Sequence, residues 1–294
     1  MRRILIHFDT DPVPSVFDRV VAIDAGVDEL LSYGGITPEN VESLVHGAIF
    51  TRGPTDLKQT AIFIGGSRVD EGQRLFEKVR RVFFGPMRVS VMMDSNGSNT
   101  TAAAAVLAAK KHADLKGRTA LVLGGTGPVG QRAAELLARE GASVRVASRS
   151  LERANSAVAT IRASITGAAV PKIAVSGVSS GSASDVEQAC RDVEILIAAG
   201  AAGAQFLSND QREGMAGLKV AIDLNAVPPV GLAGIEVTDK ATPRHAAFCY
   251  GAIGVGGTKM KIHKACIGRL FESNDQVLDT ERIYQIGETL ALSK

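Results

Sequence analysis

The chain has 294 residues, of which 45% are hydrophobic and 22% are charged, and its formal net charge is +2. This composition is that of a globular protein with a sizeable core, and a domain size of about 150 residues suggests two domains. A net charge this small gives no general attraction to nucleic acid or to an acidic membrane surface.

Three cysteines, Cys190, Cys249 and Cys266, lie far apart in the sequence. Their odd number and wide spacing fit neither a disulfide framework nor a metal site, which favours a reducing, cytoplasmic environment. The apolar run after Arg2 and Arg3 is too short for a signal peptide. No uncharged stretch reaches the ~18 residues of a membrane span, so no membrane association is expected.

The first third of the chain alternates between strand-like and helix-like segments. Ser15 is a suitable N-cap for a helix that starts at Val16, and Thr37-Pro38 is a suitable helix start with proline in the first turn. Alternation of this kind predicts an α/β layer. Strands are predicted for residues 3–8, 61–64 and 88–93, and helices from 16 onward, from 37 onward, for 69–84 and for 102–111.

A polar run follows the strand predicted at 88–93. The run has more hydrogen-bonding side chains than are needed to cap the next helix, since one hydroxyl or carboxylate is enough for a cap. Open α/β sheets bind ligands where strands end and helices begin, so the run is a candidate substrate site. The alternative is a solvated loop that only caps the helix. The run consists of Asp94, Ser95, Asn96, Gly97, Ser98, Asn99, Thr100 and Thr101.

A glycine-rich turn after the apolar strand 120–123 is the strongest motif of the chain. Gly125, Gly127 and Gly130 match G-x-G-x-x-G, with a strand before them and a helix, predicted for 131–140, after them. We expect Gly125 to allow a tight turn, Gly127 to let the backbone approach a pyrophosphate, and Gly130 to let helix and strand pack closely. Thr126, Pro128 and Val129 complete the predicted phosphate-binding segment, whose phosphates lie at the helix N-terminus.

The strand 143–147 leads into Ser148-Arg149-Ser150, about 20 positions after the glycines. An acidic residue at this place binds the ribose of NAD, but here two hydroxyls flank an arginine. Such a group can hold a 2′-phosphate through charge-assisted hydrogen bonds, so the pattern predicts NADP as the cofactor. The alternative is an arginine that only ends a strand.

The rest of the chain continues the alternation. Small residues such as Ala199 and Gly200 follow the strand 193–198 and leave room for a nucleoside, and Asn225 begins a rigid loop after the strand 219–223. Both are candidate cofactor-binding positions. The other expectations are a helix at 152–164, a loop at 176–184, a short helix at 186–191, and a glycine-rich turn at 251–261 that enters a helix ending at Phe271.

Several segments together resemble the bacterial NADP-dependent methylene-tetrahydromethanopterin / methylene-tetrahydrofolate dehydrogenases of one-carbon metabolism and methylotrophy. The most specific are residues 94–101 and 254–261, because neither is a general nucleotide-binding motif. The others span nearly the whole chain and are 8–11, 14–18, 33–34, 51–53, 60–63, 125–130, Asn225 with Pro228-Pro229, His263 and 270–273. The sequence departs from the family pattern at His46 and in residues 52–59. These departures leave open whether tetrahydromethanopterin or tetrahydrofolate is the preferred one-carbon carrier.

The resemblance implies two α/β domains with a cleft between them. A pterin-binding domain would comprise residues 1–114 and 259–294, and a Rossmann-like NADP domain with a parallel sheet would comprise residues 115–258. It also implies that Asp18 and the 94–101 run contact a tetrahydropterin and that Lys259 is catalytic. The implied reaction moves a hydride from the methylene carbon to NADP and leaves a methenyl cation, in a homo-oligomer.

The reaction explains what the chain lacks. Two nitrogen atoms already stabilise the cation, so positioning of the two rings is the main requirement. The five histidines show no metal-binding spacing and no serine lies in a nucleophile elbow, so no metal is expected.

Three other functions share parts of this pattern. A folate-specific methylene-tetrahydrofolate dehydrogenase/cyclohydrolase would need a lysine–tyrosine pair in the first domain, and neither Lys58 nor Lys78 lies in a convincing motif. A shikimate-type dehydrogenase has the same two-domain plan. A non-catalytic NADP sensor would keep the glycines and Arg149 but has no need of the polar run 94–101.

Overall fold

The computed structural model describes residues 1–165 and 174–292. Contacts divide the chain into two compact units, Met1–Thr100 with Met260–Lys294 and Thr101–Lys259. The first division falls within helix α4 (Ser98–Lys110) and the second within helix α9 (Ala252–Arg269), so a continuous helix makes each crossing. Our domain prediction placed the first crossing after α4, between residues 114 and 115.

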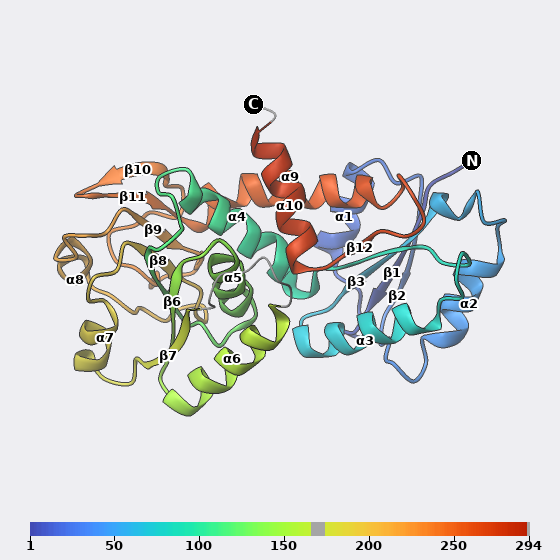
Figure 1. Cartoon of the computed structure of the whole chain (residues 1–294). Coiled ribbons are helices and arrows are strands. Elements are labelled where there is room, and N and C mark those ends of the chain that lie inside the picture. The colour runs from blue at the N-terminus through green and yellow to red at the C-terminus, as the bar shows by residue number, and fades with distance from the viewer. Residues whose placement is uncertain (166–173, 293–294) are drawn as a thin grey trace. The chain divides into compact units, whose positions relative to one another are not determined.

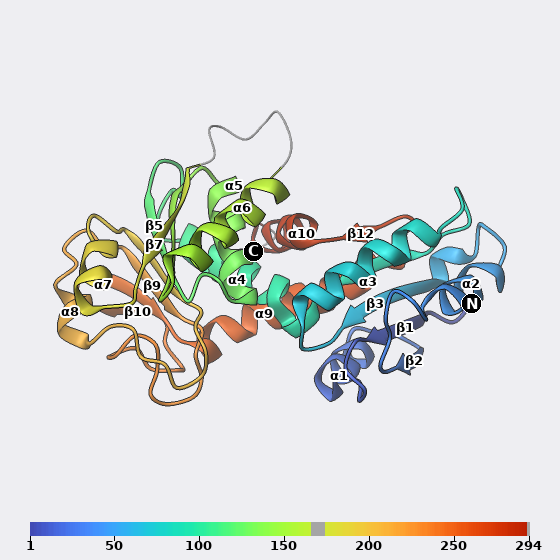
Figure 2. The ribbon, with the colours of Figure 1, turned by 90° about the horizontal axis from the view of Figure 1, so that it is seen from below.

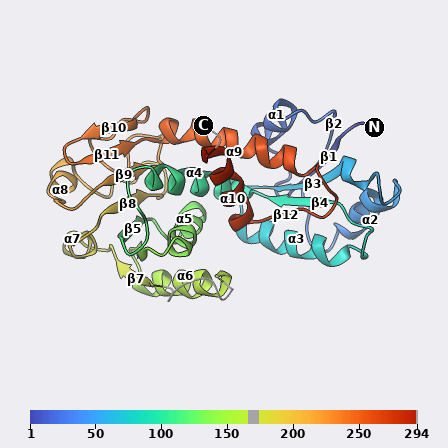
Figure 3. The ribbon, with the colours of Figure 1, turned by 45° about the horizontal axis from the view of Figure 1, so that its top comes forward.

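The first unit contains a five-stranded sheet in the order β12-β4-β3-β1-β2, and every pairing in it is parallel. The short strand β12 comes from the C-terminal part of the chain and lies beside β4 (Figure 3). The strand order reverses between β1 and β3, the kind of position at which open α/β sheets bind ligands. The strands are β1 (Ile4–Asp9), β2 (Glu29–Tyr33), β3 (Thr60–Gly65), β4 (Ser90–Met93) and β12 (Val277–Leu278).

Helices cover both faces of this sheet, with α1 and α3 on opposite sides (Figure 2). Alternate residues of the strands, such as Ile6, Phe8, Ile62 and Ile64, pack with buried side chains of α2 and α3 in one apolar core. The period of two along a strand therefore places His7 and Asp9 on the other face. The helices are α1 (Val16–Asp24), α2 (Glu42–Phe50), α3 (Val69–Val82) and α10 (Thr280–Leu292).

The second unit contains a seven-stranded sheet in the order β10-β11-β9-β8-β5-β6-β7 (Figure 1). Numbered from β5, its parallel strands follow the order 3-2-1-4-5-6 of dinucleotide-binding folds, and β10 is antiparallel to β11. The predicted α/β class with a Rossmann-like domain is thus confirmed. The strands are β5 (Thr119–Leu123), β6 (Ser143–Ser148), β7 (Val175–Ser179), β8 (Ile195–Ala198), β9 (Val220–Asp223), β10 (Lys240–Arg244) and β11 (Ala247–Tyr250).

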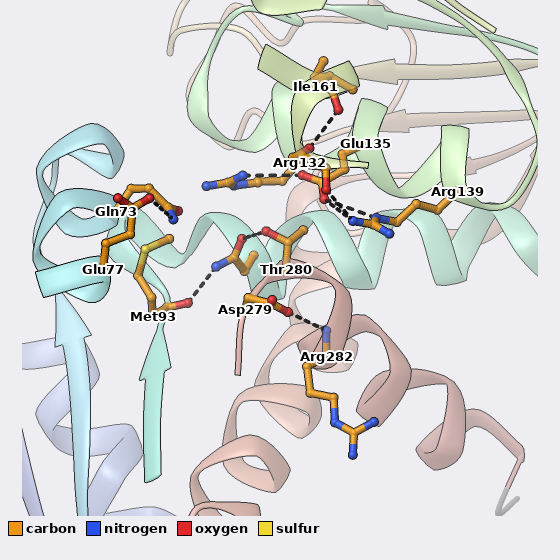
Figure 4. A network of polar contacts seen from close by, with 12 residues as sticks. Gln73, Glu77, Met93, Arg132, Glu135, Arg139, Ile161, Asp279, Thr280 and Arg282 are labelled. Carbon is orange, nitrogen blue, oxygen red and sulfur yellow. Dashed lines mark hydrogen bonds and ion pairs between the residues drawn. The ribbon is translucent and has the colours of Figure 1, made fainter. Parts of the chain in front are cut away.

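A buried acidic side chain is held along helix α5 of this unit. The Glu135 carboxylate lies 3.4 Å from Arg132 and 3.2 Å from Arg139, one turn before and one turn after it on the same helix (Figure 4). Spacings of three and four residues bring such side chains to one helix face. The helices of the unit are α5 (Pro128–Arg139), α6 (Leu151–Ser164), α7 (Ala183–Ala189) and α8 (Asn209–Glu213).

Three local predictions were wrong. Thr37-Pro38 does not start a helix, because the Asn40 side chain accepts from Thr37 N and donates to Gly35 O in a turn, and α2 begins only at Glu42. The predicted loop 176–184 contains strand β7, which pairs with β6. The predicted glycine-rich turn 251–261 is helical from Ala252 onward.

No helix in residues 1–165 and 174–292 combines the length and the apolar character that a membrane crossing requires.

Candidate functional site

The turn between β5 and α5 is built on close backbone contacts that exclude side chains. Gly124 has φ +67°, and a Cβ there would lie 2.5 Å from Gly200 Cα. The glycine of this turn with left-handed backbone angles is therefore Gly124, whereas we expected Gly125 to allow the tight turn. A Cβ on Gly125 would lie 2.8 Å from Val146, and one on Gly130 would lie 2.6 Å from Gly124 O, so these two glycines permit close packing.

Gly127 is the N-cap of α5, with extended backbone angles, and Pro128 is the first helical residue. The Gln131 side chain donates to Thr126 O and fixes the turn from inside. The shortest contact of a Cβ on Gly127 would be 3.3 Å, to Gly124 O, so packing constrains this position less than it constrains Gly124, Gly125 or Gly130. An anion can thus approach the positive N-terminal end of the helix, which fits a dinucleotide pyrophosphate.

Ser148, Arg149 and Ser150 lie at the end of β6 and the start of α6. Ser150 is the N-cap of α6 and accepts from Arg153 N at 3.3 Å, while Ser150 N donates to Ser148 Oγ at 3.4 Å. The Arg149 side chain is exposed. The geometry therefore presents a cation beside a helix N-terminus, which is a suitable setting for a phosphate.

Two further candidate positions lie after β8 and β9. Gly200 packs against Phe206, whose ring lies 2.2 Å from the position of a Cβ, and Ala199 N donates to Leu123 O. Asn225 is buried, and its amide accepts from Val227 N and donates to Pro229 O. Asn225 therefore shapes the loop after β9, and its contact with a cofactor stays a prediction.

Asp223 anchors the same loop from the end of β9. Its carboxylate accepts from Asn225 N at 3.0 Å and from Leu232 N at 2.7 Å. Burial raises the pKa of Asp223, although these backbone hydrogen bonds favour the ionised form. The Asp223 carboxylate thus joins the two ends of the segment that carries Asn225.

The polar run after β4 is mostly buried and bonded to itself. Asp94 accepts from Asn99 N at 2.8 Å and Thr100 N at 3.1 Å, and its second oxygen accepts from Thr100 Oγ1 at 2.6 Å. These bonds satisfy N–H groups in the first turn of α4. Asp94 is completely buried. It therefore caps α4, and a direct contact with substrate stays a prediction.

Other members of the run hold neighbouring elements. Ser95 Oγ donates to Gly65 O at 2.9 Å, and Ser98 Oγ donates to Ser95 O. Asn99 donates to Met93 O at 2.6 Å and accepts from Thr280 Oγ1 at 2.8 Å, which joins β4 to α10 (Figure 4). Only Asn96, Gly97 and Thr101 of the run are not fully buried.

This distinction yields a testable prediction. Asp94→Ala should lower the free energy of unfolding by about 2–4 kcal/mol, because three buried donors lose their acceptor. Asn96→Gly should leave stability nearly unchanged, since Asn96 is exposed with φ 56°, a conformation that glycine adopts readily. Urea unfolding of both variants measures this, and equal stability losses would contradict the assigned capping role.

A second group of polar side chains meets at the point where the strand order of the first unit reverses. His7 Nε2 lies 3.3 Å from Asp9 Oδ2, and both side chains are buried. A Cβ on Gly65 would lie 2.6 Å from His7 Nε2 and 3.3 Å from both Asp9 Oδ2 and Asp18 Oδ2. Burial opposes ionisation of Asp9, but His7 and the backbone N–H groups of Ser15 and Asp11 outweigh it and lower the pKa of Asp9.

An aromatic cluster adjoins this group and contains a second buried histidine. His263 of α9 stacks on Phe63, with ring centroids 5.6 Å apart, and Phe63 makes an edge contact with His7 at 5.3 Å. His263 Nδ1 lies 3.9 Å from Asp94 Oδ2, and Phe17 lies 6.4 Å from the same imidazole. The sequence reasoning assigned no role to His7, Asp9 or Phe17. The one local feature that could have indicated a site is the spacing of His7 and Asp9, which lie two residues apart at the end of a strand and therefore on the same face.

Lys259 lies in the interior of α9, about two turns after the helix begins at Ala252, and its side chain is partly exposed. It is the last residue of the second unit. The prediction that Lys259 lies in a glycine-rich turn is therefore wrong, and its catalytic role stays a prediction. A helical position fixes the direction in which the side chain leaves the backbone.

Comparison with known proteins identifies the family. The family model "Methylene-tetrahydromethanopterin dehydrogenase, N-terminal" matches residues 16–96. The chain is 32% identical to the "NAD(P)-dependent methylenetetrahydromethanopterin dehydrogenase" of Methylorubrum extorquens, over 99% of this chain and 100% of the relative. The chain belongs to the methylene-tetrahydromethanopterin dehydrogenase family. It is also 42% identical to the "Bifunctional protein MdtA" of the same organism, over 99% of both chains.

Solved structures support the fold of this dehydrogenase family member. The quinate dehydrogenase of Corynebacterium glutamicum in complex with NAD matches with a TM-score of 0.54 and 12% identity, over 98% of this chain and 99% of that one. The shikimate dehydrogenase of Aquifex aeolicus matches with a TM-score of 0.51 and 14% identity, over 99% and 97%. At these identities the likeness concerns the fold alone.

Proposed function

We propose that the chain is an NADP-dependent dehydrogenase of methylene-tetrahydromethanopterin and/or methylene-tetrahydrofolate. The observation that carries this proposal is the Gly124–Gly130 turn at the strand-order reversal of a 3-2-1-4-5-6 sheet, in a chain that belongs to this family. The turn, Arg149 and the small residues after β8 would hold the dinucleotide.

The chemistry asks little of the protein beyond placement of its substrates. One C–H bond of the methylene carbon breaks, its electron pair and hydrogen leave together as hydride, and the two adjacent nitrogens stabilise the remaining cation. Bound NADP⁺ supplies the hydride acceptor. No proton is transferred, so Lys259, Asp18, Asn96 and Thr101 would act by orienting the pterin and by tuning the charge around it.

Preference for NADP gives a prediction at Arg149. Arg149→Ala should weaken NADP⁺ binding by about 1.5–3 kcal/mol, the cost of losing a charged hydrogen-bond partner. NAD⁺ binding should change little, because NAD⁺ carries no 2′-phosphate. Calorimetric titration of both nucleotides measures this difference.

Arg153→Ala is a matched control, because Arg153 is an exposed arginine of the same helix start that was not assigned to the nucleotide. It should bind both nucleotides nearly as the unchanged protein does. Equal weakening of NADP⁺ and NAD⁺ binding in Arg149→Ala would show that Arg149 does not read the 2′-phosphate.

The proposed activity is tested by mixing the chain with methylene-tetrahydromethanopterin or methylene-tetrahydrofolate and either nucleotide. With NADP⁺ and methylene-tetrahydromethanopterin we expect the absorbance of NADPH to increase. The methenyl product has an absorbance of its own, so its persistence or decay separates a dehydrogenase from a dehydrogenase/cyclohydrolase. If no combination of pterin and nucleotide gives reduced nucleotide although NADP⁺ binds, the alternative of a non-catalytic NADP sensor is favoured.

The formation of a homo-oligomer also stays a prediction.

A further inference from the structure

Three potential metal ligands converge in the first unit. His7, Asp9 and Asp18 each offer one ligand atom, and these atoms all lie within 4.8 Å of one another. The closest pair, His7 Nε2 and Asp9 Oδ2, is 3.3 Å apart. Two ligands that bind one metal ion at about 2.0–2.2 Å are separated by a similar distance in tetrahedral geometry. His7 and Asp9 are buried, and Asp18 is partly buried.

His7 is the observation that points to a missing ligand. Its side chain is 1% exposed, and within the described residues neither ring nitrogen makes a hydrogen bond of good geometry, although Nε2 lies 3.3 Å from Asp9 Oδ2. Leaving a buried polar group without a partner costs about 1–3 kcal/mol, so such groups require an explanation. An imidazole nitrogen beside two carboxylate oxygens is a good metal ligand when it is neutral.

Gly65 lies beside the three ligands, and a side chain at this position would collide with them. It is the register partner of Asp9 on the neighbouring strand, and any side chain there would point at His7, Asp9 and Asp18 together. The three ligand atoms therefore all lie close to one side of Gly65, where only a residue without a side chain leaves them undisturbed. Ligand atoms that converge from three residues can bind a single ion between them.

Backbone contacts orient the two carboxyl-bearing residues from behind. Asp9 Oδ1 accepts from Asp11 N and Asp9 Oδ2 accepts from Ser15 N, both at 2.9 Å. Ser15 Oγ accepts from Asp18 N at 3.2 Å, which fixes the first turn of α1. Hydrogen bonds of this kind hold metal-binding carboxylates in place in metalloproteins.

We propose that His7, Asp9 and Asp18 bind one divalent transition-metal ion, with Zn²⁺ as the ion best suited to one imidazole and two carboxylate ligands. The spacing of these residues in the sequence matches no metal motif, which is why none was expected. Three protein ligands leave at least one position open to water or to an oxygen atom of a bound molecule. The inference does not depend on the proposed reaction, because its test measures metal binding in the absence of both the pterin and the nucleotide.

The test is a titration of the full chain, freed of metal by a chelator and then desalted, with Co²⁺ as a spectroscopic substitute for Zn²⁺. One Co²⁺ per chain with visible ligand-field bands is expected, and calorimetry with Zn²⁺ should give the same stoichiometry. His7→Gln keeps the size and polarity of the side chain but removes the ligand nitrogen, and should weaken binding at least tenfold. Gly65→Ala should do the same, because its Cβ would displace the His7 imidazole.

His46→Gln is the matched control, because His46 lies on α2 and contacts Phe50 and Phe84 instead. Its metal affinity should equal that of the unchanged protein. Thermal melts establish whether each variant folds. If His7→Gln does not fold, Asp18→Asn is used in its place. Absence of stoichiometric binding in the unchanged protein, or equal binding by a folded ligand variant, would overturn the proposal.

Discussion

Gly127→Val should abolish measurable NADP binding and leave a folded protein. Gly127 is the N-cap of α5, and a Cβ there would make a tight contact of 3.3 Å with Gly124 O and an ordinary one of 3.5 Å with Ala199 O, so a small shift of the turn accommodates it. The two methyl groups of valine would extend in front of the helix N-terminus, where the pyrophosphate must approach. We expect at least ~100-fold weaker binding, which is about 2.7 kcal/mol.

Gly217→Val is the matched control for this experiment. Gly217 precedes β9, and a Cβ there would have no contact closer than 3.8 Å. The control should bind NADP normally and melt near the temperature of the unchanged protein. Normal NADP binding by Gly127→Val, with both variants folded, would show that this turn does not hold the phosphates.

The nucleotide turn was predictable because its determinants are local. An apolar strand, a glycine-rich turn and a helix follow one another without interruption in residues 119–139. The requirement for glycine at Gly124 could not be predicted in full, because a Cβ there would also collide with Gly200, which follows β8. That contact joins segments far apart in the sequence.

The polar run 94–101 shows the opposite case. Composition indicated an excess of hydrogen-bonding groups, but their partners are Gly65 O, Met93 O, Thr280 and the first N–H groups of α4. Strand order and burial decide which polar side chain faces a ligand and which serves the fold. For the same reason the meeting of His7 and Asp9 with Asp18 over Gly65 appears only once β1 is paired with β3.

The sequence predicts a turn where α9 begins, because glycine disfavours helix interiors by about 1 kcal/mol relative to alanine. Packing explains Gly254 in the first turn of α9 and Gly251, which precedes the helix. A Cβ on Gly251 would lie 2.1 Å from Glu236 O, and one on Gly254 would lie 1.7 Å from Asp239 O. Close approach of the helix to this backbone therefore requires glycine, and tertiary contacts outweigh the propensity.

Lys259→Ala should lower the rate of hydride transfer by about 100-fold or more while NADP affinity and melting temperature stay near those of the unchanged protein. The family resemblance assigns Lys259 to catalysis, and its place inside α9 gives the ammonium group a defined direction. Losing one group that positions a reactant or stabilises developing charge has an effect of this size. Alanine is a good helix former, so α9 should persist.

Lys261→Ala is the matched control, since Lys261 is an exposed lysine two residues further along the same helix, and neighbours at this spacing point to different helix faces. Rapid mixing with saturating NADP⁺ and methylene-tetrahydromethanopterin separates the hydride-transfer step from product release. The control should transfer hydride at nearly the unchanged rate. If Lys259→Ala stays within twofold of Lys261→Ala, Lys259 has no catalytic role, and Asn96 and Asp18 become the first residues to replace.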